Sequence, residues 1–453
     1  MAAVVVGAVS VLSQAQDNEL KRLRADYAMR FLEPEPHMAL AKYFLDRGDR
    51  LQAFYLLEAA RRSHLEEKVF NRAFQLAFRG FDYGPDAERS LLKELAANPQ
   101  SETVNFKLAD LYIARDELQK AKPYLVAASK IQPDDFKYVV GLAEILRIEG
   151  HVQDGDQLTK DFLSKHSDSE EAWISRIEES IDKDPALAKS LLAHARAKFP
   201  KSSGLAFDQA RVFQREGKLD EAEKTFVEAA QLSPASADVQ AWTGRFFLKV
   251  RVNKPKALDY YLNAYFLNPD TYDGEYAESR IRNLNWDLAQ AEVAKRNQLG
   301  VPVEELLNDA NPVVVDQTLQ QISKNWKASY LNVALNCLGH DDEEVRWIAT
   351  QLIKSHVDRS FDPILKALLS DEDLRKRGLA AYLAVHLWKR DSFEIMKKML
   401  TEDSELLRFD AISALILEGE EEGRRIALEH AANERHPLLR QLLEKAKQEK
   451  PQP

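Results

Sequence analysis

Five basic residues between positions 211 and 280 fall at spacings that suit one face of a helical array. They are Arg211, Arg215, Arg245, Lys249 and Arg280. A guanidinium group presents parallel N–H donors that fit both oxygens of a carboxylate. If these side chains share one wall, they predict a site for an acidic peptide or for a C-terminal carboxylate. The alternative is a charged face that meets only solvent.

Motifs for catalysis are absent from the sequence, which has no P-loop, HExxH, GxSxG or dinucleotide-binding pattern. Ser90 and Lys93 match the SxxK spacing of serine–lysine hydrolases, but they flank a packing residue, Leu91, and we interpret the match as chance. The closest histidine pair, His430 and His436, flanks a turn and lacks the convergent spacing of a zinc site. We therefore predict no catalytic residue, no metal and no cofactor.

Composition indicates the kind of protein and which partners it disfavours. The chain has 453 residues, of which 45% are hydrophobic and 30% charged, and these values indicate a folded water-soluble protein. A formal net charge of -10 argues against nucleic acid, which needs clustered Lys and Arg. The single cysteine, Cys337, excludes an internal disulfide and is expected to be a buried core residue.

The first residues form an apolar run from Ala2 to Leu12, followed by small residues around Ala15. This resembles a secretory signal, although no Lys or Arg precedes the run, and it is too short to span a bilayer. Residues 1–16 are thus predicted to be a signal peptide or hydrophobic leader, which places the protein in a bacterial periplasm or cell envelope. A cytoplasmic location is the alternative, and membrane association requires that the leader be retained.

The chain repeats itself with a period near 34 residues. One copy places small residues and one aromatic at Gly217, Ala222, Phe226, Ala229 and Pro234, and another has Ala121, Leu125, Ala128 and Pro133 in the same places. The two prolines are 101 residues apart, close to three periods. Small residues suit helices that cross closely, glycine permits the positive φ that ends a helix, and proline ends the pair.

This pattern resembles the tetratricopeptide repeat, with about seven units over residues 34–269. The resemblance implies an all-α, right-handed superhelical solenoid whose first helices line a concave groove that binds a protein or peptide. Some members clamp chaperone C-termini with a Lys and Asn set. That partner is not carried over, because Met38 and Lys42 stand where the set would lie.

One column of the expected groove is apolar apart from one arginine, and consists of Met38, Arg72, Phe106, Val140, Trp173, Phe207 and Ala241. Its rings, Phe106, Trp173 and Phe207, could hold a partner helix or an extended peptide. The alternative is that these side chains turn into the core. Their neighbours Asn105 and Ala206 occupy places where the tetratricopeptide repeat often has a large core residue.

A second period begins near residue 300. A hydrophobic residue followed by arginine recurs at Arg346, Arg375, Arg408 and Arg440, with spacings of 29, 33 and 32. Acidic residues precede these helices, and we expect Asp341, Asp371 and Asp403 to cap them. The pattern resembles short bacterial HEAT repeats, four to five over residues 300–445. We expect the arginines to bridge adjacent repeats through the acidic helix starts.

Three other segments complete the expected organisation. Residues 17–33 form an N-terminal helix, and residues 446–453 a disordered tail. Residues 270–299 form one or more helices that cover the end of the first array. The apolar face of that segment is expected to consist of Ile281, Leu284, Trp286 and Leu288.

Together these features predict a non-enzymatic adaptor or assembly scaffold that binds a protein or peptide in the groove of the first array and the adjoining second array. An acidic peptide is the partner that the basic column favours. The alternative is a subunit of an enzyme that handles a small ligand. It is favoured by the resemblance of the second array to the short HEAT arrays of bilin lyases, in which the repeat protein itself handles a chromophore.

Overall fold

A computed structural model describes residues 18–63, 67–79, 85–115, 117–166, 168–269 and 272–448. The described residues form helices joined by turns, with no strand among them, which confirms the predicted all-α class. The expected leader, residues 1–16, lies outside these ranges, so export stays a prediction. By packing, the chain divides into unit 1, which comprises residues up to Ala77 and from Arg282 onward, and unit 2, Phe78–Ile281.

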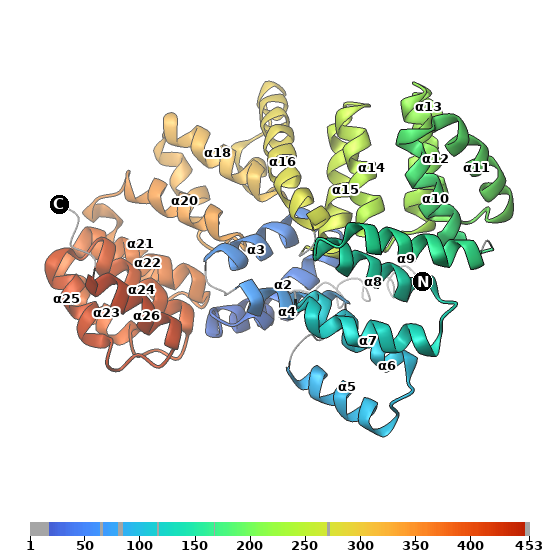
Figure 1. The fold of residues 1–453 in the computed structure, drawn as a ribbon. Helices are drawn as coiled ribbons and strands as arrows, with labels where there is room; N and C mark the ends of the chain where they lie inside the picture. The colour runs from blue at the N-terminus through green and yellow to red at the C-terminus, as the bar shows by residue number, and fades with distance from the viewer. Residues whose placement is uncertain are drawn as a thin grey trace, which may run out of the picture. The chain divides into compact units, whose positions relative to one another are not determined.

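Unit 2 is a succession of helices that pack in pairs, α6 with α7 and so on to α14 with α15 (Figure 1). Their bounds are α5 Pro85–Ala97, α6 Glu102–Ala114, α7 Leu118–Ile131, α8 Phe136–Ile148, α9 Val152–Lys165, α10 Glu170–Lys183, α11 Pro185–Lys198, α12 Ser203–Arg215, α13 Leu219–Leu232, α14 Ala237–Lys249 and α15 Lys254–Leu267. Serine hydroxyls at Ser101, Ser202 and Ser236 cap the first helices of three pairs.

The pair α12 and α13 shows why the repeated spacing folds this way. Gly217 joins the two helices with a φ of 73°, and a Cβ there would meet no neighbour. The backbone conformation, rather than lack of space, therefore requires glycine. Ala222 and Ala229 are fully buried, and Phe226 is almost so, which confirms that the repeated residues pack the helices together.

The segment between the two expected arrays is one helix of 27 residues, α16 Tyr272–Gln298, which begins in unit 2 and ends in unit 1. Ile281 and Leu284 are buried as predicted. Trp286 is 43% exposed, so its assignment to the apolar face was wrong. Two residues advance a helix by about 200°, and Trp286 therefore points away from the face that holds Leu284.

Unit 1 combines the start and the end of the chain. Residues 18–29 are helical. The further helices are α2 Pro34–Leu45, α3 Arg50–Ser63, α4 Glu67–Phe74, α17 Val303–Leu307, α18 Pro312–Lys324, α19 Leu331–Cys337, α20 Glu343–Lys354, α21 Asp362–Leu368, α22 Leu374–Trp388, α23 Phe393–Met399, α24 Glu405–Leu417, α25 Glu420–His430 and α26 Pro437–Gln448. The last helix extends into the segment expected to be a disordered tail, whose residues 449–453 lie outside the described part.

The N-terminal residues of unit 1 pack against its C-terminal helices. The backbone N–H of Leu32 donates to Glu405 at 2.9 Å, and the Ser404 hydroxyl donates to the Ala28 carbonyl at 2.6 Å. The rings of Phe31 and Phe409 lie 5.5 Å apart. This grouping differs from the sequence-based division, which joined residues 34–77 to the first array. A repeat period reports packing between neighbouring helices, and it carries no information on contacts between distant segments.

Two of the four recurring arginines of the C-terminal array, Arg375 and Arg408, are buried and bridge successive helices, as predicted. The prediction was wrong for the other two, because Arg346 donates to carbonyls just before its own helix and Arg440 is exposed. Arg375 is 2% exposed and reaches Asp341, which precedes α20, at 2.5 Å. Arg24 pairs with the same carboxylate at 2.5 Å. Burial alone would raise the pKa of Asp341, but the hydrogen bond from Arg24 and the charges of both arginines lower it. Arg408 pairs with Glu434, which precedes α26, at 3.2 Å.

The helix caps differ from those predicted. The expected caps were Asp341, Asp371 and Asp403, whereas the side chains that accept first-turn N–H groups of α20, α22 and α24 belong to Asp342, Asp373 and Ser404. Asp341 is engaged by two arginines instead. At α20 the two aspartates are adjacent, and the one next to the helix caps it while its neighbour binds the cations.

Candidate functional site

Helix α14 carries an exposed face built from Trp242, Arg245 and Lys249. Spacings of three and four residues place them along one side of the helix. The Arg245 guanidinium lies over the Trp242 ring, 4.9 Å from its centre, and the ring is 38% exposed. A cation held over an indole face is attracted by the ring and is fixed in orientation. Arg245 is thus presented outward from a flat support.

Helix α16 brings a second stacked cation to the same place. The Arg280 guanidinium lies 4.7 Å from the centre of the Tyr276 ring, whose edge meets the ring of Tyr261 on α15. Burial raises the pKa of Tyr261, and the charges of Arg280 and Arg245 both oppose that rise. Both guanidinium groups therefore lie near one hydroxyl group. A Cβ on Gly244 would stand 3.1 Å from the Tyr261 ring, so α14 packs tightly here.

We call Arg245, Lys249 and Arg280, with the rings of Trp242 and Tyr276, the basic strip. These three cations come from the predicted column of five, and the structure separates the other two from them. Arg211 pairs with the fully buried Asp208 at 3.2 Å. Arg215 donates to the Ile181 carbonyl at 2.7 Å and pairs with Asp182. Internal partners thus engage both of these arginines.

The buried partner of Arg211 has an unusual environment. Burial raises the pKa of Asp208 to about 7, the charge of Glu178 adds to the rise, and Arg211 opposes it. One carboxylate oxygen, Oδ2, has no hydrogen-bond partner. Arg211 is therefore held against a carboxyl group that is only partly ionised at neutral pH.

The predicted aromatic column is turned partly into the core. Phe106 is half-buried with its ring 5.5 Å from that of Tyr138, and Trp173 is half-buried. Phe207 is 8% exposed, and its ring lies 6.1 Å from that of Trp242. The alternative of core packing therefore describes Phe207. Its contact with Trp242 nevertheless makes it a support for the basic strip.

Sequence reasoning missed the two rings that carry the arginines. Trp242 precedes Arg245 by three residues, and Tyr276 precedes Arg280 by four. Each aromatic residue thus lies one helical turn before its cation, where side chains meet. The same spacing joins Phe207 to Arg211, whose guanidinium lies 5.9 Å from the centre of that ring, so the spacing alone does not separate Arg211 from Arg245 and Arg280.

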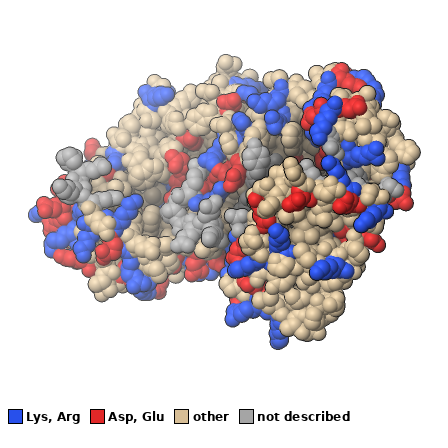
Figure 2. All heavy atoms as spheres, in the orientation of Figure 1, with Lys and Arg blue, Asp and Glu red and all other residues tan. Residues whose placement is uncertain are grey.

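Charge over the rest of the surface is mixed. On the face that Figure 2 shows, Lys and Arg in blue are interspersed with Asp and Glu in red. Salt bridges such as those from Arg251 to Asp220 and Glu223 link neighbouring helices of unit 2. Exposed pairs of this kind contribute little to stability individually. Arg245 and Arg280 differ from these cations because each lies over a ring without forming an ion pair within the described residues.

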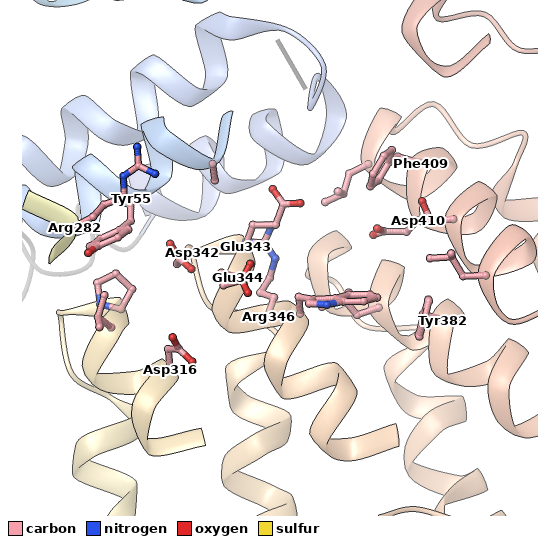
Figure 3. A pocket seen from close by; sticks show the side chains of 18 of the residues that line it. Tyr55, Arg282, Asp316, Asp342, Glu343, Glu344, Arg346, Tyr382, Phe409 and Asp410 are labelled. Atoms are coloured by element: carbon pink, nitrogen blue, oxygen red, sulfur yellow. The ribbon is translucent and has the colours of Figure 1, made fainter. Parts of the chain in front are cut away.

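Unit 1 contains a cavity of about 550 Å³, lined by side chains of α3, α16, α18, α20, α22 and α24 (Figure 3). This volume lies in the usual range of small-molecule and peptide-anchor sites. The lining includes five carboxylates, from Asp316, Asp342, Glu343, Glu344 and Asp410, and two arginines, Arg282 and Arg346. No sequence pattern indicated this site, because its lining residues come from separate segments between Tyr55 and Leu417.

The other residues considered for catalysis or metal binding belong neither to the basic strip nor to this cavity. Cys337 is buried as predicted, and burial raises its pKa to about 12, which keeps the thiol protonated and unreactive. Ser90 and Lys93 are both exposed on α5. Across the described ranges, His, Cys, Asp and Glu side chains do not gather in a group that could hold a metal ion. Within the same ranges, every helix is too short or too polar to cross a bilayer.

No protein-family model and no curated protein matches this chain. Among solved structures it is similar to YrrB, a TPR protein with an unusual peptide-binding site, at 18% identity over 42% of this chain and 98% of that one, with a TM-score of 0.24. It is similar to the TPR domain of P58(IPK) at 15% identity over 91% and 97% of the two chains, with a TM-score of 0.23. It is also similar to the human IFIT1 dimer with PPP-AAAA, at 15% identity over 92% and 95%, with a TM-score of 0.33.

Proposed function

We propose that the protein is a non-enzymatic adaptor or assembly scaffold that holds an acidic peptide segment of a partner protein on the basic strip. The observation that carries the proposal is that the cations of the basic strip form no ion pairs in the part of the chain that the structure describes. Within the described residues, no carboxylate forms an ion pair with Arg245, Lys249 or Arg280. Two of the three are stacked on rings, and Nε of Arg280 is buried there, so the donors available to a partner are those of Arg245 and the terminal nitrogens of Arg280.

Stacking favours an acidic partner for a physical reason. A free arginine side chain loses rotamer freedom when it binds, and this loss opposes binding. A guanidinium that already lies over an aromatic ring has lost part of that freedom beforehand, and it can still donate two parallel hydrogen bonds. Two such groups near Tyr261, with Lys249 beside them, match a segment that carries two or three carboxylates.

The test measures how tightly an acidic peptide binds. The probe is a fluorescein-labelled dodecapeptide of alternating Glu and Ser, with a Gln and Ser peptide as its neutral counterpart, and anisotropy is the readout. The variant replaces Arg245, Lys249 and Arg280 by Glu. We expect about tenfold weaker binding or more, because three attractive charges become repulsive.

A matched control separates local recognition from net charge. Lys130, Lys201 and Lys224 are exposed cations elsewhere in unit 2, and replacing all three by Glu changes the net charge by the same amount. We expect this control to weaken binding by no more than about twofold at 0.15 M salt, where distant charges are screened. Equal losses in the two triple variants would show that the strip is not a specific site.

A further inference from the structure

Carboxylates outnumber arginines by five to two in the lining of the unit 1 cavity. Arg346 is 4% exposed and donates to the carbonyls of His340 and Asp341, at 2.8 and 3.0 Å, and to the Tyr27 hydroxyl. Arg282 pairs with the fully buried Glu58 at 3.3 Å. The hydrogen bonds of Arg346 thus go to carbonyl and hydroxyl oxygens, and Arg346 acts on Asp342 and Asp410 through its charge alone.

The carboxylates show the effect of this shortage of positive charge. Burial raises the pKa of Asp316, and it raises that of Asp342 to about 6. Burial also raises the pKa of Asp410 to about 8, where the charge of Arg346 opposes the rise and that of Glu343 adds to it. Each of these groups is easier to protonate than an ordinary aspartate, because too little positive charge compensates it.

The helix that faces Asp410 is shaped to admit its carboxylate. Asp410 lies on α24, and a Cβ on Gly378 of α22 would collide with the Asp410 Oδ2 atom. Glycine inside a helix costs about 1 kcal/mol relative to alanine. At this position it leaves the space that the carboxylate occupies. Within the described part of the chain, no hydrogen bond or ion pair is formed by Asp410.

Aromatic side chains form the rest of the wall. Trp286 and Trp347 are 43% and 39% exposed, which is unusual for rings of this size. Trp347 packs edge-on against Tyr382 at 5.3 Å, and Phe409 lies beside Asp410. In Figure 3, Glu343 and Asp410 approach the cavity from α20 and α24, with Tyr382 and Phe409 near Asp410. Carboxylates next to aromatic faces form the surroundings that bind organic cations.

We propose that this cavity binds an arginine side chain carried by a peptide segment of a partner protein, with the guanidinium at Asp410 and the flanking residues against Trp286 and Trp347. The cavity shares no residue with the basic strip, so a test of this proposal does not decide the function proposed above. A guanidinium supplies the positive charge that the lining lacks, and its flat face matches the rings. The volume exceeds that of one side chain and leaves room for its neighbours in the peptide.

The experiment compares two pentapeptides that differ in one charge. The first is acetyl-Gly-Leu-Arg-Leu-Gly-amide, and in the second citrulline, which is neutral and nearly the same shape, replaces arginine. Isothermal titration and tryptophan fluorescence measure binding at pH 8.5, where Asp410 is mostly ionised. We expect the arginine peptide to bind about tenfold more tightly than the citrulline peptide.

Two variants test the role of Asp410. Asp410→Asn removes the charge and keeps the shape, and Gly378→Ala displaces the carboxylate without altering any charge. Both are expected to reduce the preference for arginine over citrulline to about twofold or less. Glu372→Gln, at an exposed position elsewhere in unit 1, should leave the preference intact. Thermal unfolding confirms that each variant is folded, and Asp410→Asn should be no less stable than the parent because it removes a poorly compensated charge.

Several results would overturn the proposal. Equal affinity for the two peptides would show that charge is not recognised, and a preference that persists in Asp410→Asn would place the cation elsewhere. No detectable binding of the arginine peptide at about 1 mM would exclude this occupant. Binding of spermidine or of Ca²⁺ without binding of the peptide would assign the cavity to a small cation instead.

Discussion

Arginine has opposite roles in the two units. In unit 1, Arg375 and Arg408 are buried, and each pairs with a carboxylate that precedes a different helix. In unit 2, Arg245 and Arg280 lie over aromatic rings with no carboxylate partner in the described residues. The first environment holds helices together, and the second leaves donors for another molecule. The neighbours of an arginine, rather than its position in a repeat, therefore indicate whether it is structural or available for binding.

Aspartates within unit 1 show the same contrast. Asp341 meets Arg24 and Arg375, and its pKa is lowered despite burial. Asp410 has no such partner, and its pKa is raised to about 8. Both carboxyl groups belong to one array, and the presence of a counter-charge alone separates them. The acidic group that lacks one is the group that faces the cavity.

The largest expected effect comes from breaking the buried arginine bridge. Arg375→Gln leaves Asp341 and Asp373 without their shared cation. We expect the free energy of unfolding of unit 1 to fall by about 3–5 kcal/mol, because the buried Asp341 then keeps only Arg24 as its counter-charge. Calorimetry of thermal unfolding measures the change.

Arg245→Gln makes the same change in the basic strip and is compared with Arg375→Gln. Arg245→Gln should change stability by less than about 0.5 kcal/mol, because the side chain is exposed and has no internal carboxylate partner in the described residues. If the two variants lost similar stability, the distinction between structural and available arginines would be wrong.

A smaller effect is expected at the pairing between Asp208 and Arg211. The folded state raises the pKa of Asp208 from 3.8 to about 7, so folding favours its protonated form. The stability from this group is fully present below about pH 4 and is lost as the pH rises through about 7. Asp208→Asn stays neutral, so it should be more stable than the parent by about 1–2 kcal/mol at pH 8.

Asp208→Asn also removes the carboxylate that pairs with Arg211. Among the described residues, Arg211 then has no ion pair, like the arginines of the basic strip. Acidic peptides should then bind about twofold more tightly. Unfolding of the same variant at pH 4 and at pH 8 gives the check. A stability difference that is the same at both values would mean that the charge of Asp208 has no cost in the folded protein.

The smallest effect concerns the ring beneath Arg245. Trp242→Ala removes the support of the guanidinium, and we expect a loss of about 0.5–1 kcal/mol in binding of an acidic peptide. Trp242→Phe keeps an aromatic face and should retain most of the affinity. Fluorescence anisotropy with the dodecapeptide measures both. Equal affinity of the alanine variant and the parent would show that stacking does not orient Arg245 for binding.

Local packing was predictable from the sequence because a short period repeats the same contact many times. The positions of Gly217, Ala222 and Phe226 predicted a helix, a turn and a second helix, and the arginine spacing predicted bridges such as Arg375 to Asp341. In each case both partners lie within about one repeat of each other. Contacts of this range leave a regular trace in the chain.

The candidate sites were less predictable, since they depend on contacts that no period records. The cavity draws Tyr55 and Asp410 from opposite ends of the chain, and neither residue has a distinctive neighbour pattern. Arg245 and Arg211 both lie near a ring, and separating them required the knowledge that Arg211 also pairs with the carboxylate of Asp208. The exposed position of Trp286 could have been predicted, because a helical projection places it on a different face from Leu284.

The contacts that Ala28 and Leu32 make with Ser404 and Glu405 impose an order of events on synthesis of the protein. The paired residues are 376 and 373 positions apart. A ribosome that adds about 5–20 residues per second needs roughly 20–75 s to travel that distance. Throughout this interval the first helices exist without the surface they will cover, while the whole of unit 2 emerges and has time to fold. Unit 1 is therefore completed only after unit 2 has emerged, although part of unit 1 precedes unit 2 in the chain.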